Sequence, residues 1–250
     1  MKSRTGGYWE QALSESPGSN RWSGVDTPLA ETEFVAIDVE TTGQHPFLVI
    51  EIGAAAFDLE HTIRVFDTLV ECRARINPYA RRRHHITSDM LVDAPAFGDA
   101  RSAFLEFAGN AVWVQHSHDG FDSWLLSRGM GRVLDRPTFD TTRMASVLLE
   151  LPKGRIAGLD WLAKELGVQA QAEHHALGDA RVTAACFCRL VGIGRQRHSW
   201  ETLGDLESTV GQARRHPLSQ GSAPKARRAR RRRGADLVGP GPVEGAGSGG

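Results

Sequence analysis

The sequence of 250 residues contains only three cysteines, Cys72, Cys186 and Cys188. The number is odd, no C-x-x-C pair occurs and no spacing suits zinc, which argues against a disulfide framework and a zinc finger. On a helix the two side chains of the 186–188 C-x-C pair would point about 200° apart, because an α-helix has ~3.6 residues per turn. We therefore expect reduced, mostly buried thiols.

Long hydrophobic runs are also missing, since no window approaches eighteen consecutive apolar residues. The segment 1–10 lacks the basic-then-apolar order of a secretory signal. We expect a cytoplasmic protein without a membrane partner. Hydrophobic residues make up 40% of the chain and charged residues 24%, values typical of globular proteins, which excludes wholesale disorder.

The chain has no formal net charge, with 30 Lys and Arg against 30 Asp and Glu. Seven of the positive charges fall within residues 225–233, so the rest of the chain carries an excess of seven negative charges. An acidic body suits a core that gathers carboxylates around cations better than a surface that binds nucleic acid everywhere. The basic run itself is interpreted either as a tether for phosphates or as a solubilising tail.

Composition divides the chain into three parts. Residues 1–30 mix small and polar residues without periodicity and are expected to form a disordered arm. Residues 31–195 carry the hydrophobic patterns of one folded domain. Residues 196–250 begin with a short helix around 200–213 and continue as a disordered, Arg-rich tail that cannot form a core.

The folded domain is predicted to be α/β. Apolar runs predict five strands, at residues 34–37, 48–57, 62–70, 112–114 and 138–141. Helical periodicity predicts four helices, around residues 97–108, from 121 onward, at 159–166 and at 180–190. Strands that come first and then alternate with helices predict a mixed sheet with helices on its faces.

Asp38 and Glu40 are the first chemical signal, because they directly follow the buried run 34–37. Side chains alternate along a strand, so these two carboxylates project from the same face. They repel each other unless cations lie between them, which predicts the oxygen-rich kind of site that Mg²⁺ and Mn²⁺ prefer. A strand end that reaches solvent is the ordinary alternative. The Thr-Thr-Gly at 41–43 favours the site, because a nucleotide can approach such a backbone closely.

The run at 38–43, followed by Ile-Glu-Ile-Gly-Ala at 50–54, resembles the first motif of the DEDDh (DnaQ-like) 3′–5′ exonucleases. This group includes the proofreading epsilon subunit of bacterial DNA polymerase III, ribonuclease T and oligoribonuclease. Three later segments resemble family motifs in the same order: the connecting segment 86–97, Ser-His-Asp-Gly-Phe-Asp at 117–122, and His-His-Ala-Leu-Gly-Asp-Ala at 174–180.

The resemblance covers about residues 33–192 and implies a ribonuclease H-like fold, a mixed five-stranded sheet flanked by helices. It implies a 3′–5′ exonuclease that uses two Mg²⁺ or Mn²⁺ ions to release nucleoside 5′-monophosphates from DNA or RNA. The metal ligands that it implies are Asp38, Glu40, Asp122 and Asp179. His174 is implied as the general base, and because an imidazole has an unperturbed pKa of about 6.5, activity is expected to rise with pH through that region.

Two assignments have rivals. The second motif is one residue shorter than the H-N-A-x-F-D of many members, so Asp119 competes with Asp122 as the ligand. In the third motif two histidines adjoin, and the family pattern assigns the base to His174 and makes His175 a variable position often held by Arg.

Substrate contacts are implied near the first two motifs, at Thr41, Thr42, Gly43, Phe47 and His118. Phe47 either stacks on a base or packs in the core. His118 and the neighbouring His116 either lie near the substrate or are ordinary hydrogen-bonded histidines. The arginines at 81–83 form either a phosphate-facing patch or a solvated loop.

The expected partner is a single-stranded or frayed 3′ end of DNA or RNA, with a DNA polymerase as a second candidate in a proofreading or repair role. The oligomeric state stays open. A catalytically inactive module that binds nucleic acid or a polymerase is the alternative function, and loss of a motif carboxylate would support it. None is missing.

Overall fold

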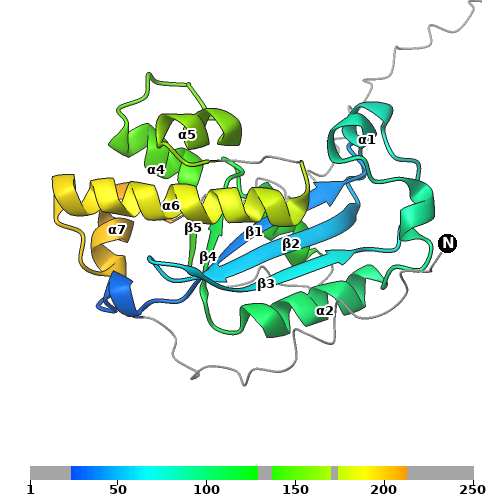
Figure 1. Ribbon diagram of the computed structural model, residues 1–250, viewed down its shortest axis with the longest axis horizontal. Helices are drawn as coiled ribbons and strands as arrows, with labels where there is room; N and C mark the ends of the chain where they lie inside the picture. The colour runs from blue at the N-terminus through cyan, green and yellow to red at the C-terminus, as the bar shows by residue number, and fades with distance from the viewer. Residues whose placement is uncertain (1–23, 129–136, 170–173, 213–250) are drawn as a thin grey trace, which may run out of the picture. The chain divides into compact units, whose positions relative to one another are not determined.

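The computed structural model describes residues 24–128, 137–169 and 174–212, which form a mixed sheet and the helices around it (Figure 1). The strands are β1 (Phe34–Thr41), β2 (Val49–Phe57), β3 (Thr62–Leu69), β4 (Val112–Gln115) and β5 (Thr138–Asp140). Their order in the sheet is β3-β2-β1-β4-β5. β1 is antiparallel to β2 and parallel to β4, β3 is antiparallel to β2, and β5 is parallel to β4. This is the five-stranded mixed sheet expected from the sequence.

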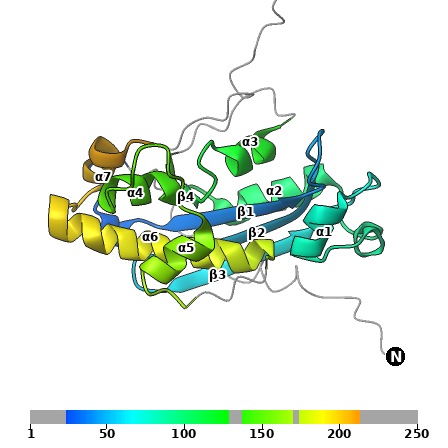
Figure 2. The same cartoon turned by 90° about the horizontal axis from the view of Figure 1, so that it is seen from above.

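Helices cover both faces of the sheet. They are α1 (Pro78–His84), α2 (Phe97–Ala108), α3 (Phe121–Ser127), α4 (Thr141–Leu148), α5 (Leu159–Glu165), α6 (Ala176–His198) and α7 (Leu203–Val210). The long α6 crosses one face above β1 and β2, whereas α2 lies on the opposite face (Figures 1 and 2). No helix in these described ranges is both long and apolar enough to cross a lipid bilayer.

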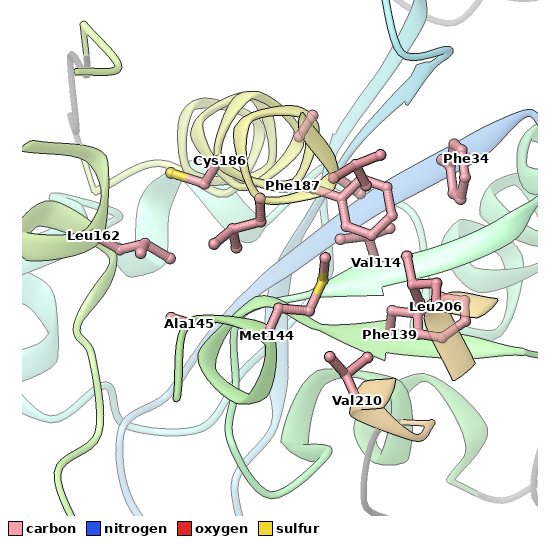
Figure 3. Packing of buried hydrophobic residues seen from close by; sticks show 14 of the residues in the cluster. Phe34, Val114, Phe139, Met144, Ala145, Leu162, Cys186, Phe187, Leu206 and Val210 are labelled. Carbon is pink, nitrogen blue, oxygen red and sulfur yellow. The ribbon is translucent and has the colours of Figure 1, made fainter. Parts of the chain in front are cut away.

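The first residues of β1 on the α6 face belong to an apolar core. Phe34 and Ala36 point to this face, and the Phe34 ring packs 4.8 Å from the Phe187 ring of α6, centre to centre. Figure 3 shows this core with Phe34, Val114 and Phe187 labelled. Because side chains alternate along the strand, Asp38 and Glu40 continue the same row toward the beginning of α6.

The opposite face of β1 is apolar from Val35 to Val39. Val35, Ile37 and Val39 pack with Phe104 of α2 and Trp113 of β4 in a second core. The residues on this face stay apolar, whereas those on the α6 face change from apolar to acidic after Ala36. The sequence is therefore continuously apolar from Phe34 to Ile37 and then alternates between carboxylates and apolar residues.

Two helices were not among the predicted elements. α1 begins at Pro78 and is capped by Asn77, whose side chain accepts a hydrogen bond from the Tyr79 N–H (2.8 Å). α4 begins at Thr141, where we expected strand, because the Asp140 side chain accepts from the Thr142 N–H (2.9 Å) and caps a helix there. Both helices are at most eight residues long, too short to display a clear hydrophobic period.

The packed part of the chain extends beyond both predicted limits of the domain. Leu29, placed by the sequence in a disordered arm, is fully buried, and its N–H donates to the Glu201 carbonyl (2.8 Å). Trp200 and Leu206, beyond the expected limit at residue 195, belong to the same core as Phe187. The segments around Leu29 and Trp200 have no hydrophobic periodicity of their own and are ordered by contacts between them and with the core. Local sequence patterns do not reveal such contacts. The predicted Arg-rich tail and most of the N-terminal arm lie outside the described residues.

Candidate active site

Three carboxylates from distant parts of the chain meet at the end of β1. Asp38 and Glu40 reach the α6 face of the sheet, and Asp179 approaches them from the first turn of α6. One oxygen of each lies within 4.8 Å of an oxygen of the others. The sequence-predicted acidic pair is therefore brought together with the third-motif carboxylate.

Asp122 enters the same region from the first turn of α3 and is 6% exposed. Its charge is the largest contribution, after burial, to the raised pKa of Asp38, which places the two carboxyl groups in the same region. Asp122 is not in the group of three whose oxygens lie within 4.8 Å of one another. The charge of the rival residue Asp119 helps to raise the pKa of Asp122.

The pKa values of all four carboxyl groups are raised above their ordinary values. Burial comes first and mutual repulsion second as reasons why the pKa of Asp38 lies well above its ordinary value. Burial together with neighbouring carboxylates raises the pKa of Glu40 to about 8 and that of Asp122 to about 8. Burial likewise raises the pKa of Asp179.

Such a set fits divalent cations. The donors are all carboxylate oxygens, the chemistry that Mg²⁺ and Mn²⁺ take. The Oδ1 atom of Asp179 is buried and has no hydrogen-bond partner among the described residues, which is costly unless a cation or another group satisfies it. Positive charge placed between the carboxylates would remove the repulsion that raises their pKa values.

The two adjacent histidines of the third motif have different surroundings. His174 precedes α6 with a left-handed backbone (φ 47°) and lies near enough to Asp179 for its charge to lower the pKa of that carboxyl. His175 lies against β2, with Nε2 2.9 Å from Oε1 of Glu51. Of these two histidines, only His175 forms an ion pair within the described part of the chain.

Glu51 is a functional candidate that the sequence analysis did not single out. It is 1% exposed, and its second oxygen accepts a hydrogen bond from the Ala176 N–H (3.0 Å) at the beginning of α6. Burial raises its pKa to about 7, although this N–H and His175 act in the opposite direction. A lone glutamate within the otherwise apolar strand 49–57 was the available signal, because a buried carboxylate needs partners.

Gly53, two residues further along β2, allows α6 to begin so close to the sheet. A Cβ atom at this position would lie 2.1 Å from the backbone of Ala176 and Leu177. Glu51 and Gly53 lie on the same face of β2. Glu51 accepts the hydrogen bond from the start of α6, and Gly53 leaves space for the α6 backbone. Together they fix the start of the helix that carries Asp179.

The turn after β1 is organised by its own side chains. The Thr42 hydroxyl is buried and accepts from the Leu48 N–H (3.2 Å), and the Thr41 hydroxyl accepts from the Gly43 N–H (3.2 Å). Gly43 has a positive φ of 70°, which favours glycine. Phe47 is partly buried and packs edge-on against the Phe121 ring, with centres 5.3 Å apart.

The histidines of the second motif also differ. His118 is exposed and has a positive φ of 60° just ahead of α3. His116 is partly buried, with Nδ1 2.7 Å from the Thr141 hydroxyl. His116 thus has the surroundings of a hydrogen-bonded structural histidine, whereas His118 is exposed to solvent.

Comparison with known proteins identifies the family. The family model described as Exonuclease (RNase_T) matches residues 35–187, more than half of the chain. The chain belongs to this exonuclease family. Members of the exonuclease family are hydrolases of phosphodiester bonds, and the resemblance to DEDDh exonucleases is confirmed.

Solved exonuclease structures have the same fold. The nuclease domain of 3′hExo, a DEDDh family member bound to rAMP, matches with a TM-score of 0.56 and 15% identity over 65% of this chain and 92% of that one. Exonuclease X in complex with 5′ overhanging duplex DNA matches with a TM-score of 0.52 and 22% identity over 71% and 97%. The expected ribonuclease H-like architecture is thereby confirmed.

Two curated relatives carry names from DNA replication. A DNA polymerase III subunit epsilon-like protein of Rhodobacter capsulatus is 35% identical over 67% of this chain and 25% of its own length. A PolC-type DNA polymerase III of Thermotoga petrophila is 33% identical over 66% of this chain and 12% of its own length. The chain thus spans a quarter or less of the length of these relatives.

Proposed function

We propose that this member of the exonuclease family is a metal-dependent 3′–5′ exonuclease that releases nucleoside 5′-monophosphates from the 3′ end of DNA or RNA. One observation carries the proposal, the meeting of Asp38, Glu40 and Asp179 oxygens within 4.8 Å of one another. The charge of Asp122 acts on Asp38 in the same region. All four motif carboxylates are present, which supports an active enzyme over an inactive binding module.

In this proposal Asp38, Glu40, Asp122 and Asp179 hold two divalent cations, Mg²⁺ or Mn²⁺. Bound cations of this kind stabilise charge on the attacking and leaving oxygens and make water more acidic. His174 accepts the proton as a water oxygen bonds to phosphorus, and the bond from phosphorus to the 3′ oxygen breaks. Glu51 keeps His175 and the beginning of α6 in place, so that His174 and Asp179 face the reacting atoms.

The substrate is proposed as a single-stranded or frayed 3′ end, close to the turn at 41–43 and to His118 and Phe47. A DNA polymerase is a candidate partner because both curated relatives are named after DNA polymerase III. The cytoplasmic location expected from the sequence is part of the same proposal.

The test is digestion of DNA and RNA oligonucleotides labelled at the 3′ or the 5′ end, with Mg²⁺, with Mn²⁺ or with a chelator. A 3′ label should leave first as a mononucleotide, and a 5′ label should move through a ladder of shortening products. Asp38→Ala and chelator should abolish both, while Asp99→Ala, an exposed carboxylate on α2, should leave them unchanged. Release from the 5′ end, or full activity of Asp38→Ala, would overturn the proposal.

The role of His174 has its own test, in which His174→Ala is compared with His175→Ala. With saturating metal, the wild-type rate should rise with pH as the general base loses its proton. His174→Ala should lose this rise together with about 10²–10⁴-fold in rate, the range for a general base. His175→Ala should keep the rise, and a wild-type rate that is flat with pH would remove His174 from this role.

A further inference from the structure

The exposed side of α1 carries three arginines, Arg81, Arg82 and Arg83, none of which forms an ion pair within the described part of the chain. The Arg82 guanidinium lies 5.9 Å from the centre of the Tyr79 ring, and Tyr79 is 65% exposed. We name these four residues the α1 basic surface. Cations beside an exposed aromatic ring suit a nucleic-acid strand, because phosphates meet the charge and bases can stack on the ring.

The α1 basic surface is fixed beside the proposed active site. The Asn77 N–H, at the cap of α1, donates to the Thr42 carbonyl (2.8 Å), in the turn that follows Asp38 and Glu40. A Cβ atom on Gly43 would come within 2.4 Å of the Ala80 Cβ, so the turn and the helix touch directly. Both ribbon views place α1 next to the end of β1 (Figures 1 and 2).

Arg83 is the member of this surface nearest to the carboxylates. It follows Ala80 by three residues, so both lie on neighbouring parts of the helix surface. Its charge lowers the pKa of Glu40 on β1 and that of Asp179 on α6, which places the guanidinium near both elements. Arg82 lies beside Tyr79 further round the helix and continues the positive surface away from the site.

The location of other phosphates follows from the proposed polarity of cleavage. When a strand is degraded from its 3′ end, the last nucleotide is attached through the scissile phosphate. Every other phosphate of the strand therefore lies on the 5′ side of that bond. Two divalent cations would only offset the four carboxylates, so these phosphates need other cations. We infer that the α1 basic surface binds the sugar-phosphate backbone of the substrate strand on the 5′ side of the scissile bond. This inference rests on the proposed function.

The first test measures binding of a fluorescent single-stranded DNA oligonucleotide to the full-length protein by anisotropy, in chelator, over a range of salt concentrations. Arg82→Gln/Arg83→Gln should weaken binding roughly tenfold at moderate salt and reduce the slope of log Kd against log salt by about 1.4, since each phosphate contact on a single strand contributes about 0.7. Arg189→Gln/Arg195→Gln removes the same charge from an exposed part of α6 and should change neither. Equal effects in both variants would overturn the inference.

The second test places one uncharged methylphosphonate linkage at successive positions on the 5′ side of the scissile bond. Wild type should lose about tenfold in affinity when a contacted phosphate is neutralised, whereas Arg82→Gln/Arg83→Gln should be insensitive at that position. Additive losses at every position would overturn the inference. The C-terminal basic run is present in all proteins compared, so its contribution cancels.

Failure of this inference is distinguishable from failure of the proposed function. Binding in chelator needs no hydrolysis, so an inactive protein can still give the position-specific result. Conversely, metal-dependent release of 3′ nucleotides with no difference between the two arginine variants would reject the α1 basic surface and leave the exonuclease assignment intact.

Discussion

The contact between β1 and α6 has an apolar half and an acidic half on one continuous face. Phe34 and Ala36 meet Phe187 in the first half, where burial of apolar surface stabilises the fold. Asp38 and Glu40 meet Asp179 in the second half, where burial raises carboxylate pKa values and repulsion opposes folding. The same helix, α6, and the same strand, β1, thus stabilise the fold at one end of their contact. At the other end they hold a group of carboxylates whose repulsion destabilises the fold unless cations bind.

The largest expected effect comes from the acidic half. Asp38→Asn keeps the size of the side chain but removes a buried charge, so activity should fall about a thousandfold, as when one preorganised charge-stabilising group is lost. In chelator the thermal midpoint should rise at alkaline pH, where the wild-type Asp38 carboxyl would lose its proton beside four other carboxyl groups. Nuclease assays and thermal unfolding in chelator measure the two effects, and a lower midpoint would contradict the account.

A substitution in the apolar half should lower stability and leave the rate almost unchanged. Phe187→Ala leaves a cavity between α6 and the sheet and should lower the free energy of unfolding by about 3–5 kcal/mol. The initial rate at a temperature where the variant is folded should stay close to that of wild type. Urea unfolding and single-turnover rates separate these readouts, and a large loss of rate in the folded variant would show that the halves are not independent.

Glu51 holds the beginning of α6 beside the acidic half, and its replacement should have an intermediate effect. Glu51→Ala removes the acceptor of the Ala176 N–H and the partner of His175, so we expect a loss of activity of about 10–100-fold, the range for residues that orient metal ligands. Glu51→Gln, which keeps an acceptor, should recover part of it.

The shared role of Glu51 and His175 is tested by a double-mutant cycle. If both act by placing the start of α6, Glu51→Ala/His175→Ala should cost no more than Glu51→Ala alone. Fully additive losses would mean that the two side chains act separately. Metal affinity, measured by protection from thermal unfolding, should weaken in parallel with the rate.

The smallest expected effect is a shift of stability with pH in the metal-free protein. The pKa values of Glu40 and Asp122, both about 8, lie above those of an unfolded chain, so the folded state holds protons that the unfolded state releases. This stability is fully present below the unfolded pKa values, near 4, and is lost as pH rises toward 8. The midpoint in chelator should therefore fall by several degrees from pH 5 to pH 8.5, less so with Mg²⁺, and a midpoint that rises would contradict the shifts.

Much of the sheet could be predicted because its signals are local. The alternation of side chains places Asp38 and Glu40 on one face, and five apolar runs mark the five strands. The short helices α1 and α4 were not predicted because each depends on a cap residue and on packing rather than on periodicity. The burial of Leu29 and Trp200 was missed for the same reason, since each is ordered by residues far away in the sequence.

The sequence by itself determined the types of residue at the site, their order and the family resemblance, since motif residues and alternation are properties of short segments. Only the tertiary structure decided that Asp179 meets Asp38 and Glu40, that His175 rather than His174 binds Glu51, and that α1 lies beside the turn after β1. Distances between segments depend on how helices pack on the sheet, and no local pattern specifies that packing.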